Sequence, residues 1–140
     1  MYRAAGTRRL EAGLVVGADG IQSRVRATLW PKVAAPVEIG VTAWRAATPV
    51  WTDDLAVAIT WDRGAEFGMV PLADGRVYWF GAVNSARGTA PGWFGAEELA
   101  RVQARFGNWH DPIPALIAAT DRVRRDSLAC LDQPLTTYVK

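Results

Sequence analysis

Apolar and polar residues alternate with a period of two through the middle of the chain. Val37, Ile39, Val41 and Ala43 are separated by polar, small or aromatic residues, a pattern typical of a strand with one buried face. Similar patterns predict strands at 55–61, 67–72, 77–83 and 123–131. An Asp-Gly pair at 74–75 joins two of them, as in a β-hairpin. The pattern therefore predicts an antiparallel sheet.

The first thirty residues follow another pattern. A short apolar run at 14–16 predicts a buried strand, and Gly17-Ala18-Asp19-Gly20 predicts a tight turn after it. Ile21, Val25 and Leu29 then recur every four residues, which predicts a helix that stops at Pro31. This part of the chain is expected to form strand, turn and helix.

Helices are also predicted after the hairpin. A loop is expected at 84–94, where Gly, Ser, Ala and Pro are frequent. The next helix is predicted at 96–106, with Leu99, Val102 and Phe106 on its apolar face and Gly107 at its end. Asp111-Pro112 then predicts an N-cap and a second helix to about residue 120. Residues 137–140 resemble the start of another strand.

Composition narrows the class of protein. The 140 residues are 50% apolar, enough for one folded core, and the net charge of +2 comes from scattered arginines. Such a balance argues against a nucleic-acid-binding protein. A single cysteine, Cys130, and the lack of a long apolar stretch favour a cytoplasmic protein outside the membrane. With one cysteine and one histidine, His110, no metal site is expected.

The turn at 17–20 is the best candidate for chemistry. It precedes a predicted helix, and a helix N-terminus offers free N–H groups and partial positive charge to a pyrophosphate. Gly17 and Gly20 let a ligand approach the backbone, Asp19 is an acceptor for a ribose hydroxyl, and Arg24 and Arg26 are within reach of phosphate. Asp19 followed by Gln22 also fits a helix-capping box, which needs no ligand. Spacing alone leaves both interpretations open.

The segment LVVGADGIQSRVR at 14–26 closely resembles the Asp-Gly fingerprint of the class A FAD-dependent monooxygenases, such as the para-hydroxybenzoate and salicylate hydroxylases. Later segments resemble the same family in the same order. They are Ala43-Trp44-Arg45, the hairpin at 67–80, and the helical stretch from 106 to 117. The resemblance covers nearly the whole chain from about residue 10.

The resemblance implies a fold, a reaction and site residues. The fold is α/β (α+β), with part of a Rossmann-like FAD/NAD(P)-binding domain and an antiparallel substrate-binding sheet with helices. The reaction implied by the resemblance is hydroxylation of a small, usually aromatic substrate by FAD, NAD(P)H and oxygen through a flavin hydroperoxide. Gly17, Asp19, Gly20 and Arg26 would contact the cofactors, and Arg45 would lie near the flavin. No residue is assigned as catalytic.

The resemblance also implies how the chain divides. Residues 1–30 would be a remnant of the cofactor-binding domain, 31–130 the substrate-binding sheet with two helices, and 131–140 a strand leading back. The family's GxGxxG and Gly-Asp motifs are not found in this sequence. The chain is therefore interpreted as an internal fragment that is inactive and does not hold FAD alone.

The sequence is also compatible with other functions. An epoxidase, reductase or halogenase would carry the same Asp-Gly turn. Seven tryptophans in a sheet-rich chain are also compatible with a ligand-binding module, and a truncated remnant would have no activity. Burial of Trp44, Trp61 and Trp79 would argue against the ligand-binding module.

Overall fold

The computed structural model describes residues 11–33, 35–51, 54–85 and 91–139. The chain forms two compact units, one of Val37–Cys130 and one of Met1–Pro36 with Leu131–Lys140. None of the helices in the described part of the chain is long and apolar enough to cross a membrane.

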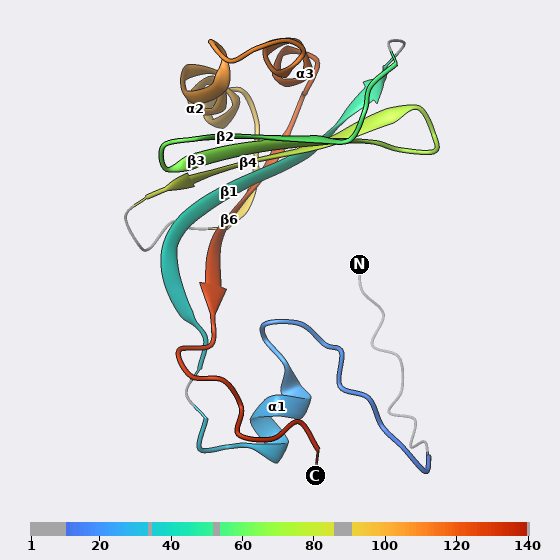
Figure 1. Ribbon diagram of the computed structural model, residues 1–140, viewed down its shortest axis with the longest axis vertical. Helices are drawn as coiled ribbons and strands as arrows, with labels where there is room; N and C mark the ends of the chain where they lie inside the picture. Colours follow the sequence, from blue (N-terminus) through green and yellow to red (C-terminus); the bar gives the residue numbers. More distant parts are fainter. Residues whose placement is uncertain (1–10, 34, 52–53, 86–90, 140) are drawn as a thin grey trace. The chain divides into compact units, whose positions relative to one another are not determined.

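The larger unit is built on a six-stranded sheet (Figure 1). Its strands are β1 (Val37–Val50), β2 (Ala58–Asp62), β3 (Ala65–Pro71), β4 (Arg76–Asn84), β5 (Gly92–Phe94) and β6 (Val123–Cys130). Their order across the sheet is β2-β3-β4-β1-β6-β5, and every neighbouring pair is antiparallel. The predicted antiparallel sheet is confirmed, and the long central strand β1 joins its two halves.

Two helices cover one face of this sheet, as Figure 1 shows: α2 (Ala96–Phe106) and α3 (Ile113–Ala118). Between helices and sheet lies the apolar core. Phe67 stacks on Trp79 with ring centroids 5.2 Å apart, and Phe106 meets Phe67 edge-on at 5.4 Å. The helices contribute further fully buried side chains, Val102, Ile113 and Leu116. Among the described residues of this unit, no helix lies on the opposite face, the open face of the sheet.

The core-facing side of β1 differs from the predicted one. Trp44 and Ala46 are buried, and the Trp44 ring meets Phe106 of α2 with centroids 6.4 Å apart. Of the residues predicted on the buried face, Val37 and Ile39 are 39% and 46% exposed, whereas Ala43 is 3% exposed. The pairing of β1 with β6 shifts around Gly40, whose φ is +73°. This irregularity ends the simple alternation on which the prediction rested.

The helix prediction at 96–106 is confirmed, with Glu97 and Glu98 in the first turn and Gly107 as the C-cap. The last helix is shorter than predicted, and Pro112 rather than Asp111 occupies its N-cap position. Strand β6 is confirmed, whereas β2 begins three residues later than expected. Strand β5 lies inside the predicted loop at 84–94, of which 86–90 are outside the described residues.

The described residues of the smaller unit form one helix, α1 (Arg24–Leu29), whose C-cap is Trp30, next to the predicted stop at Pro31. The strands predicted at 14–16 and 137–140 are wrong for the described residues, which carry no strand there. The three apolar side chains at 14–16 are 75–80% exposed. A buried strand needs neighbours on both edges, and none of the described residues supplies one.

Candidate functional site

Asp19 holds the turn that precedes α1. Its Oδ2 accepts hydrogen bonds from the backbone N–H of Arg24 at 2.7 Å and of Val25 at 3.2 Å. Ser23 is the N-cap, and its Oγ accepts from the N–H of Arg26 at 2.9 Å. The capping box predicted from Asp19 and Gln22 is wrong because the helix begins later. Asp19 nonetheless satisfies helix N–H groups, so its role in the turn needs no ligand.

Hydrogen bonds also keep the carboxyl group of Asp19 ionised. A hydrogen bond with the Ser23 side chain, followed by those from the N–H groups of Val25 and Arg24, lowers the pKa of Asp19 below its ordinary value of 3.8. Hydrogen bonds to a carboxylate favour its ionised form. The carboxylate is therefore charged at neutral pH and balances the positive end of α1.

Gly17 and Gly20 each have a structural reason to be glycine. Gly20 has a φ of +79°, in the left-handed region that side chains disfavour. A Cβ at Gly17 would lie 2.7 Å from Cγ1 of Val25, so this glycine lets the chain pass close to α1. The hydrogen-bonded turn lies at Gly20–Ser23, three residues later than the predicted turn at 17–20. The path of the chain into α1 depends on Gly17, Asp19 and Gly20, and no cofactor is required to explain them.

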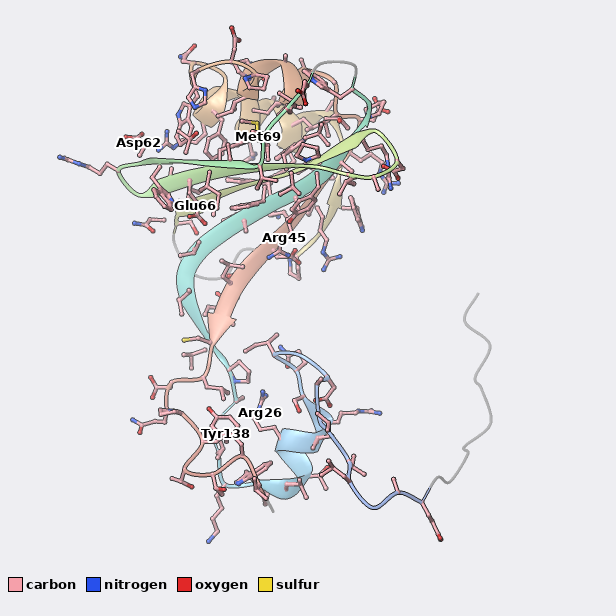
Figure 2. The ribbon with its side chains drawn as sticks, turned by 45° about the vertical axis from the view of Figure 1, so that its right-hand side comes forward. Arg26, Arg45, Asp62, Glu66, Met69 and Tyr138 are labelled. Atoms are coloured by element: carbon pink, nitrogen blue, oxygen red, sulfur yellow. The ribbon has the colours of Figure 1, made fainter. Side chains whose placement is uncertain are left out.

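Arg26 belongs to a cavity in the same unit. The cavity has a volume of about 520 Å³ and is lined by Gly17, Ser23 and Arg26 together with apolar side chains. Its apolar lining is Leu14, Val15, Val16, Val25, Leu29, Trp30, Leu131, Leu135, Tyr138 and Val139. Figure 2 labels Arg26 and Tyr138, one from each of the two segments that form the unit. A cavity with few polar groups and one guanidinium suits an aromatic group attached to an anion.

Arg45, the fifth predicted site residue, lies in the larger unit, on the open face of the sheet. It directly follows the core-facing Trp44, so it points to the other side. In Figure 2 it projects away from the helices, whereas Met69 is on the helix side. Sequence reasoning expected a charge at this place to have a partner or a cleft. The partner is Asp126, whose Oδ2 lies 2.8 Å from Arg45 Nη1.

The strand register aligns a row of side chains across the open face. Neighbouring members are Cα partners on all six strands: Ile59, Gly68, Phe80, Arg45, Arg124 and Trp93. Gly68 provides room for Phe80, because a Cβ there would be 2.2 Å from the Phe80 ring. The next row contains Trp61, Glu66, Ala82, Ala43 and Asp126. The open face thus combines aromatic, small and charged side chains.

Asp126 connects these two rows. Besides Arg45, it binds Arg124 through two hydrogen bonds, from Nε at 3.0 Å and from Nη2 at 2.8 Å. Its side chain is 15% exposed, whereas those of the two arginines are 41% and 43% exposed. The cluster carries a net charge of about +1. Asp126 and Arg124 were missed from sequence because only the strand register brings them beside Arg45.

The tryptophans divide between core and surface. Trp44 and Trp79 are buried, and Trp79 Nε1 donates to Thr120 Oγ1 at 3.0 Å. Trp61 and Trp93 are 74% and 55% exposed. The burial of Trp44 and Trp79 argues against a ligand-binding module that uses exposed tryptophans, whereas Trp61 does not. The exposed pair, however, lies on the open face with Arg45.

The remaining candidates carry no chemistry of their own. His110 Nε2 lies 2.8 Å from Thr60 Oγ1, and its Nδ1 lies 2.7 Å from the carbonyl oxygen of Asp111, so the ring links the segment between α2 and α3 to β2. Cys130 is exposed at the end of β6. Within the described ranges, no three His, Cys, Asp or Glu side chains are grouped as they would be around a metal ion.

Comparison with known proteins relates this architecture to flavin enzymes. No family model matches the chain. The chain is 36% identical over 125 residues to aurachin C monooxygenase/isomerase of Stigmatella aurantiaca, which covers 84% of the chain and 30% of that protein. It is 32% identical over 129 residues to 3-amino-4-hydroxybenzoate 2-monooxygenase of Streptomyces cremeus, covering 89% of the chain and 31% of that protein. The resemblance to monooxygenases is confirmed.

A solved structure has the same fold. HpxO of Klebsiella pneumoniae, crystallised with FAD and uric acid, superposes with a TM-score of 0.65 at 22% identity, over 81% of this chain and 30% of that one. The predicted mixed α and β class, with an antiparallel sheet and helices, is confirmed. The chain spans about 30% of the length of the proteins it matches.

Proposed function

We propose that this chain is part of a FAD-dependent monooxygenase that uses NAD(P)H and oxygen to hydroxylate a small aromatic molecule. The observation that carries the proposal is the 36% identity with aurachin C monooxygenase/isomerase over 84% of the chain. A second monooxygenase matches over 89% of the chain and has an aminohydroxybenzoate as its named substrate. Similarity of this extent makes a related reaction the best-supported function.

In the smaller unit, a side chain rather than the N-terminus of α1 is available to a dinucleotide cofactor. The first N–H groups of α1 are already bonded to Asp19 and Ser23, so they are not available to a phosphate. Arg26, which lines the 520 Å³ cavity, is the group that would meet the anionic part of FAD or NAD(P)H. Gly17, Asp19 and Gly20 would keep the turn narrow enough for close approach.

The open face would bind the aromatic substrate of this reaction. Bound FAD would supply the transfer of electrons from the nicotinamide to oxygen. This chain would supply a surface that binds the aromatic ring and excludes water, made of Phe80, Ala82 and Trp61. Arg45, held by Asp126, would place a positive charge beside the flavin. No side chain of the described residues is assigned as a general base.

The test uses the longest reading frame that contains this chain. We expect the purified product to retain FAD after gel filtration and, with NADH or NADPH, to incorporate one atom of ¹⁸O₂ into an aromatic product seen by mass spectrometry. Absence of bound flavin, or NAD(P)H oxidation without labelled product from any aromatic compound offered, would refute the proposal. The 140-residue chain by itself is expected to bind no FAD.

Two arginine variants test the assigned contacts. Arg26→Ala should raise the KM for NAD(P)H or weaken FAD binding about tenfold or more, the usual effect of losing a charged hydrogen bond. Arg24→Ala is the matched control, because Arg24 is on the same helix and does not line the cavity. Equal effects of the two substitutions would show that Arg26 contributes only general charge.

A further inference from the structure

Glu98 is a buried carboxylate that the proposed reaction does not use. It lies in the first turn of α2, and its side chain is 7% exposed. Its Oε1 accepts a hydrogen bond from Trp44 Nε1 at 2.9 Å, and its Oε2 accepts one from Arg125 Nη1 at 2.7 Å. Arg101 Nε lies 3.9 Å from the same Oε2. One helix side chain thus binds two neighbouring strands, β1 and β6 (Figure 1).

The two bonds of Glu98 to the sheet depend on how β1 and β6 are aligned. Trp44 and Arg125 are Cα partners, so Glu98 binds both members of one cross-strand pair. A slip of one residue would turn the side chains of the slipped strand to the other face. A slip of two residues would place Val123 or Ser127 opposite Trp44, and neither carries a cation. The observed register therefore satisfies both bonds, and either slip would lose at least one of them.

The register of β1 and β6 is not set by a turn between them. The neighbouring pairs β2–β3 and β3–β4 are hairpins, in which the turn fixes how the strands align. By contrast, β2–β5 and both helices of the larger unit lie between β1 and β6 in the sequence. The β1–β6 pairing is also irregular between Glu38 and Thr42. The alignment therefore relies on side-chain contacts, and the bonds of Glu98 are buried and directional.

The same register arranges the charges of the open face. The next cross-strand pair is Arg45–Arg124, and the pair on the other side of Trp44 brings Asp126 opposite Ala43. Asp126 therefore lies diagonal to Arg45, with its Oδ2 2.8 Å from Arg45 Nη1. A two-residue slip in either direction would change this diagonal arrangement, in which one carboxylate binds both arginines.

We propose that Glu98 is a positioning residue for Arg45. From the helix side of the sheet it fixes the β1–β6 register through Trp44 and Arg125. This register holds the guanidinium of Arg45 against Asp126 on the open face. The inference rests on the proposed function, in which Arg45 lies beside the flavin. Glu98 acts through the sheet and is not assigned a contact with cofactor or substrate.

Apolar residues would serve a purely stabilising role as well as Glu98 and Arg125. Replacing a buried ion pair by apolar side chains of similar size is often neutral or stabilising. Apolar side chains pack without directional bonds, so they select one strand register less strictly than a carboxylate that needs two donors. Stability and the position of Arg45 are therefore expected to respond differently to such a replacement.

The experiment follows the guanidinium signals of Arg45 in the 140-residue chain labelled with ¹⁵N, without FAD. Arg45→Lys identifies these signals. A guanidinium held by a carboxylate rotates slowly about its Nε–Cζ bond, and we expect Glu98→Leu to accelerate this rotation in Arg45 about tenfold. Urea titrations of the same samples measure the accompanying loss of stability.

Val102→Ala is the matched control. Val102 lies one turn further along α2, is fully buried and offers no hydrogen-bonding side-chain group to Trp44 or Arg125. Its truncation should lower stability and change the rotation of Arg45 by less than about twofold. Equal acceleration in Val102→Ala and Glu98→Leu would overturn the proposal, because loosening of α2 would then be a sufficient cause.

The double variant Glu98→Leu/Arg125→Leu separates positioning from stability. It leaves no uncompensated charge at the buried pair, so it should regain much of the stability that Glu98→Leu loses. The rotation of Arg45 should stay fast, because the directional bonds are still absent. Recovery of slow rotation together with stability would overturn the proposal. This comparison with unmodified chain remains decisive even if Glu98→Leu alone does not fold.

The longer protein gives a second measurement. With FAD bound, the double variant should lower kcat and leave the KM for the aromatic substrate nearly unchanged, as expected when substrate binding is intact and the reacting groups are misplaced. Val102→Ala should leave both constants close to those of the unmodified protein. An unchanged kcat in the double variant would overturn the proposal.

The positioning role and the proposed function fail separately. Lack of bound FAD in the unmodified longer protein would refute the monooxygenase function and leave the Arg45 signals of the chain unaffected. Slow Arg45 rotation retained in both Glu98 variants would refute the positioning role, while ¹⁸O incorporation into an aromatic product would still support the monooxygenase.

Discussion

The carboxylate of Asp126 on β6 lies 2.8 Å from the guanidinium of Arg45 on β1, and the same carboxylate binds Arg124. Arg45 and Arg124 are Cα partners, so without Asp126 two positive charges would face each other across the β1–β6 pair. One acidic residue thus permits two arginines to be placed side by side in the middle of the sheet.

Replacing this acid should destabilise the larger unit in a salt-dependent way. We expect Asp126→Ala to lower the free energy of unfolding by about 1 kcal/mol, since the arginines are largely exposed and screened by solvent. Urea titrations at low and high salt measure the effect, which should shrink at high salt. Asp74→Ala is the control, because the carboxylate of Asp74 pairs with Arg76 in an exposed turn. A loss no larger than the control's would contradict the role of Asp126.

A second prediction concerns the buried carboxylate of Glu98. Its side chain is 7% exposed and accepts from Trp44 Nε1 at 2.9 Å and from Arg125 Nη1 at 2.7 Å. Glu98→Ala should destabilise the unit by about 3–5 kcal/mol, because it breaks a buried ion pair and leaves the Trp44 N–H without this acceptor. Glu97→Ala, with its side chain 90% exposed, should change little in the same urea titration. Similar losses for both would contradict this assignment.

The third prediction concerns contact between β4 and α2. A Cβ at Gly81 would lie 2.8 Å from the ring of Phe106, which is fully buried and packed against Phe67. Gly81→Ala should therefore cost about 1–3 kcal/mol through overpacking. The thermal midpoint is the simplest measurement. Gly13→Ala provides the comparison, since a Cβ there meets nothing within 4 Å. A midpoint unchanged by Gly81→Ala would show that the helix moves freely away from the sheet.

The fourth prediction is the pH dependence of the turn before α1. The pKa of Asp19 is lowered in the folded chain by its hydrogen bonds with Ser23, Val25 and Arg24. Its contribution to stability is therefore fully present above its ordinary value of 3.8 and is lost as the pH falls through the lower folded value. A ¹³C titration of the carboxyl group should give a midpoint below 3.8.

The variant Asp19→Asn tests the cause of that shift. It should increase amide hydrogen exchange at Arg24 and Val25 at neutral pH and have a smaller effect at acidic pH, where the native carboxyl is also neutral. Ser23→Ala removes the other cap and should expose mainly the N–H of Arg26. Identical exchange in unmodified chain and Asp19→Asn would mean that Asp19 does not hold the turn.

Helices and turns were predictable where residues close together in the sequence determine them. Helix α2 was predicted to the residue because its apolar spacing, acidic first turn and final glycine agree. The β3–β4 hairpin followed from Asp74-Gly75, and Gly75 has the positive φ expected of that turn. The short segment at 14–16 was mispredicted because an apolar run indicates burial only if another strand is there to cover it.

The arrangement across the sheet was not predictable because it depends on contacts distant in sequence. Arg45 and Asp126 are 81 positions apart, and no periodicity along the chain relates them. The inner face of β1 was misassigned because Trp44, a large residue at a position taken as outward, packs against Phe106. Gly17, Asp19, Gly20, Arg26 and Arg45 remain proposed cofactor contacts, since the structure explains the first three without a ligand.

The adjacency of β1 and β6 has a mechanical consequence. Val37, where the chain enters the larger unit, is the Cα partner of Cys130, where it leaves. A pulling force applied through these two points would open the β1–β6 pair one hydrogen bond at a time, starting at its outer end. Such unzipping meets less resistance than shearing a whole strand at once. The larger unit is therefore well placed to be grafted between two neighbouring positions of another scaffold, yet should yield early under tension.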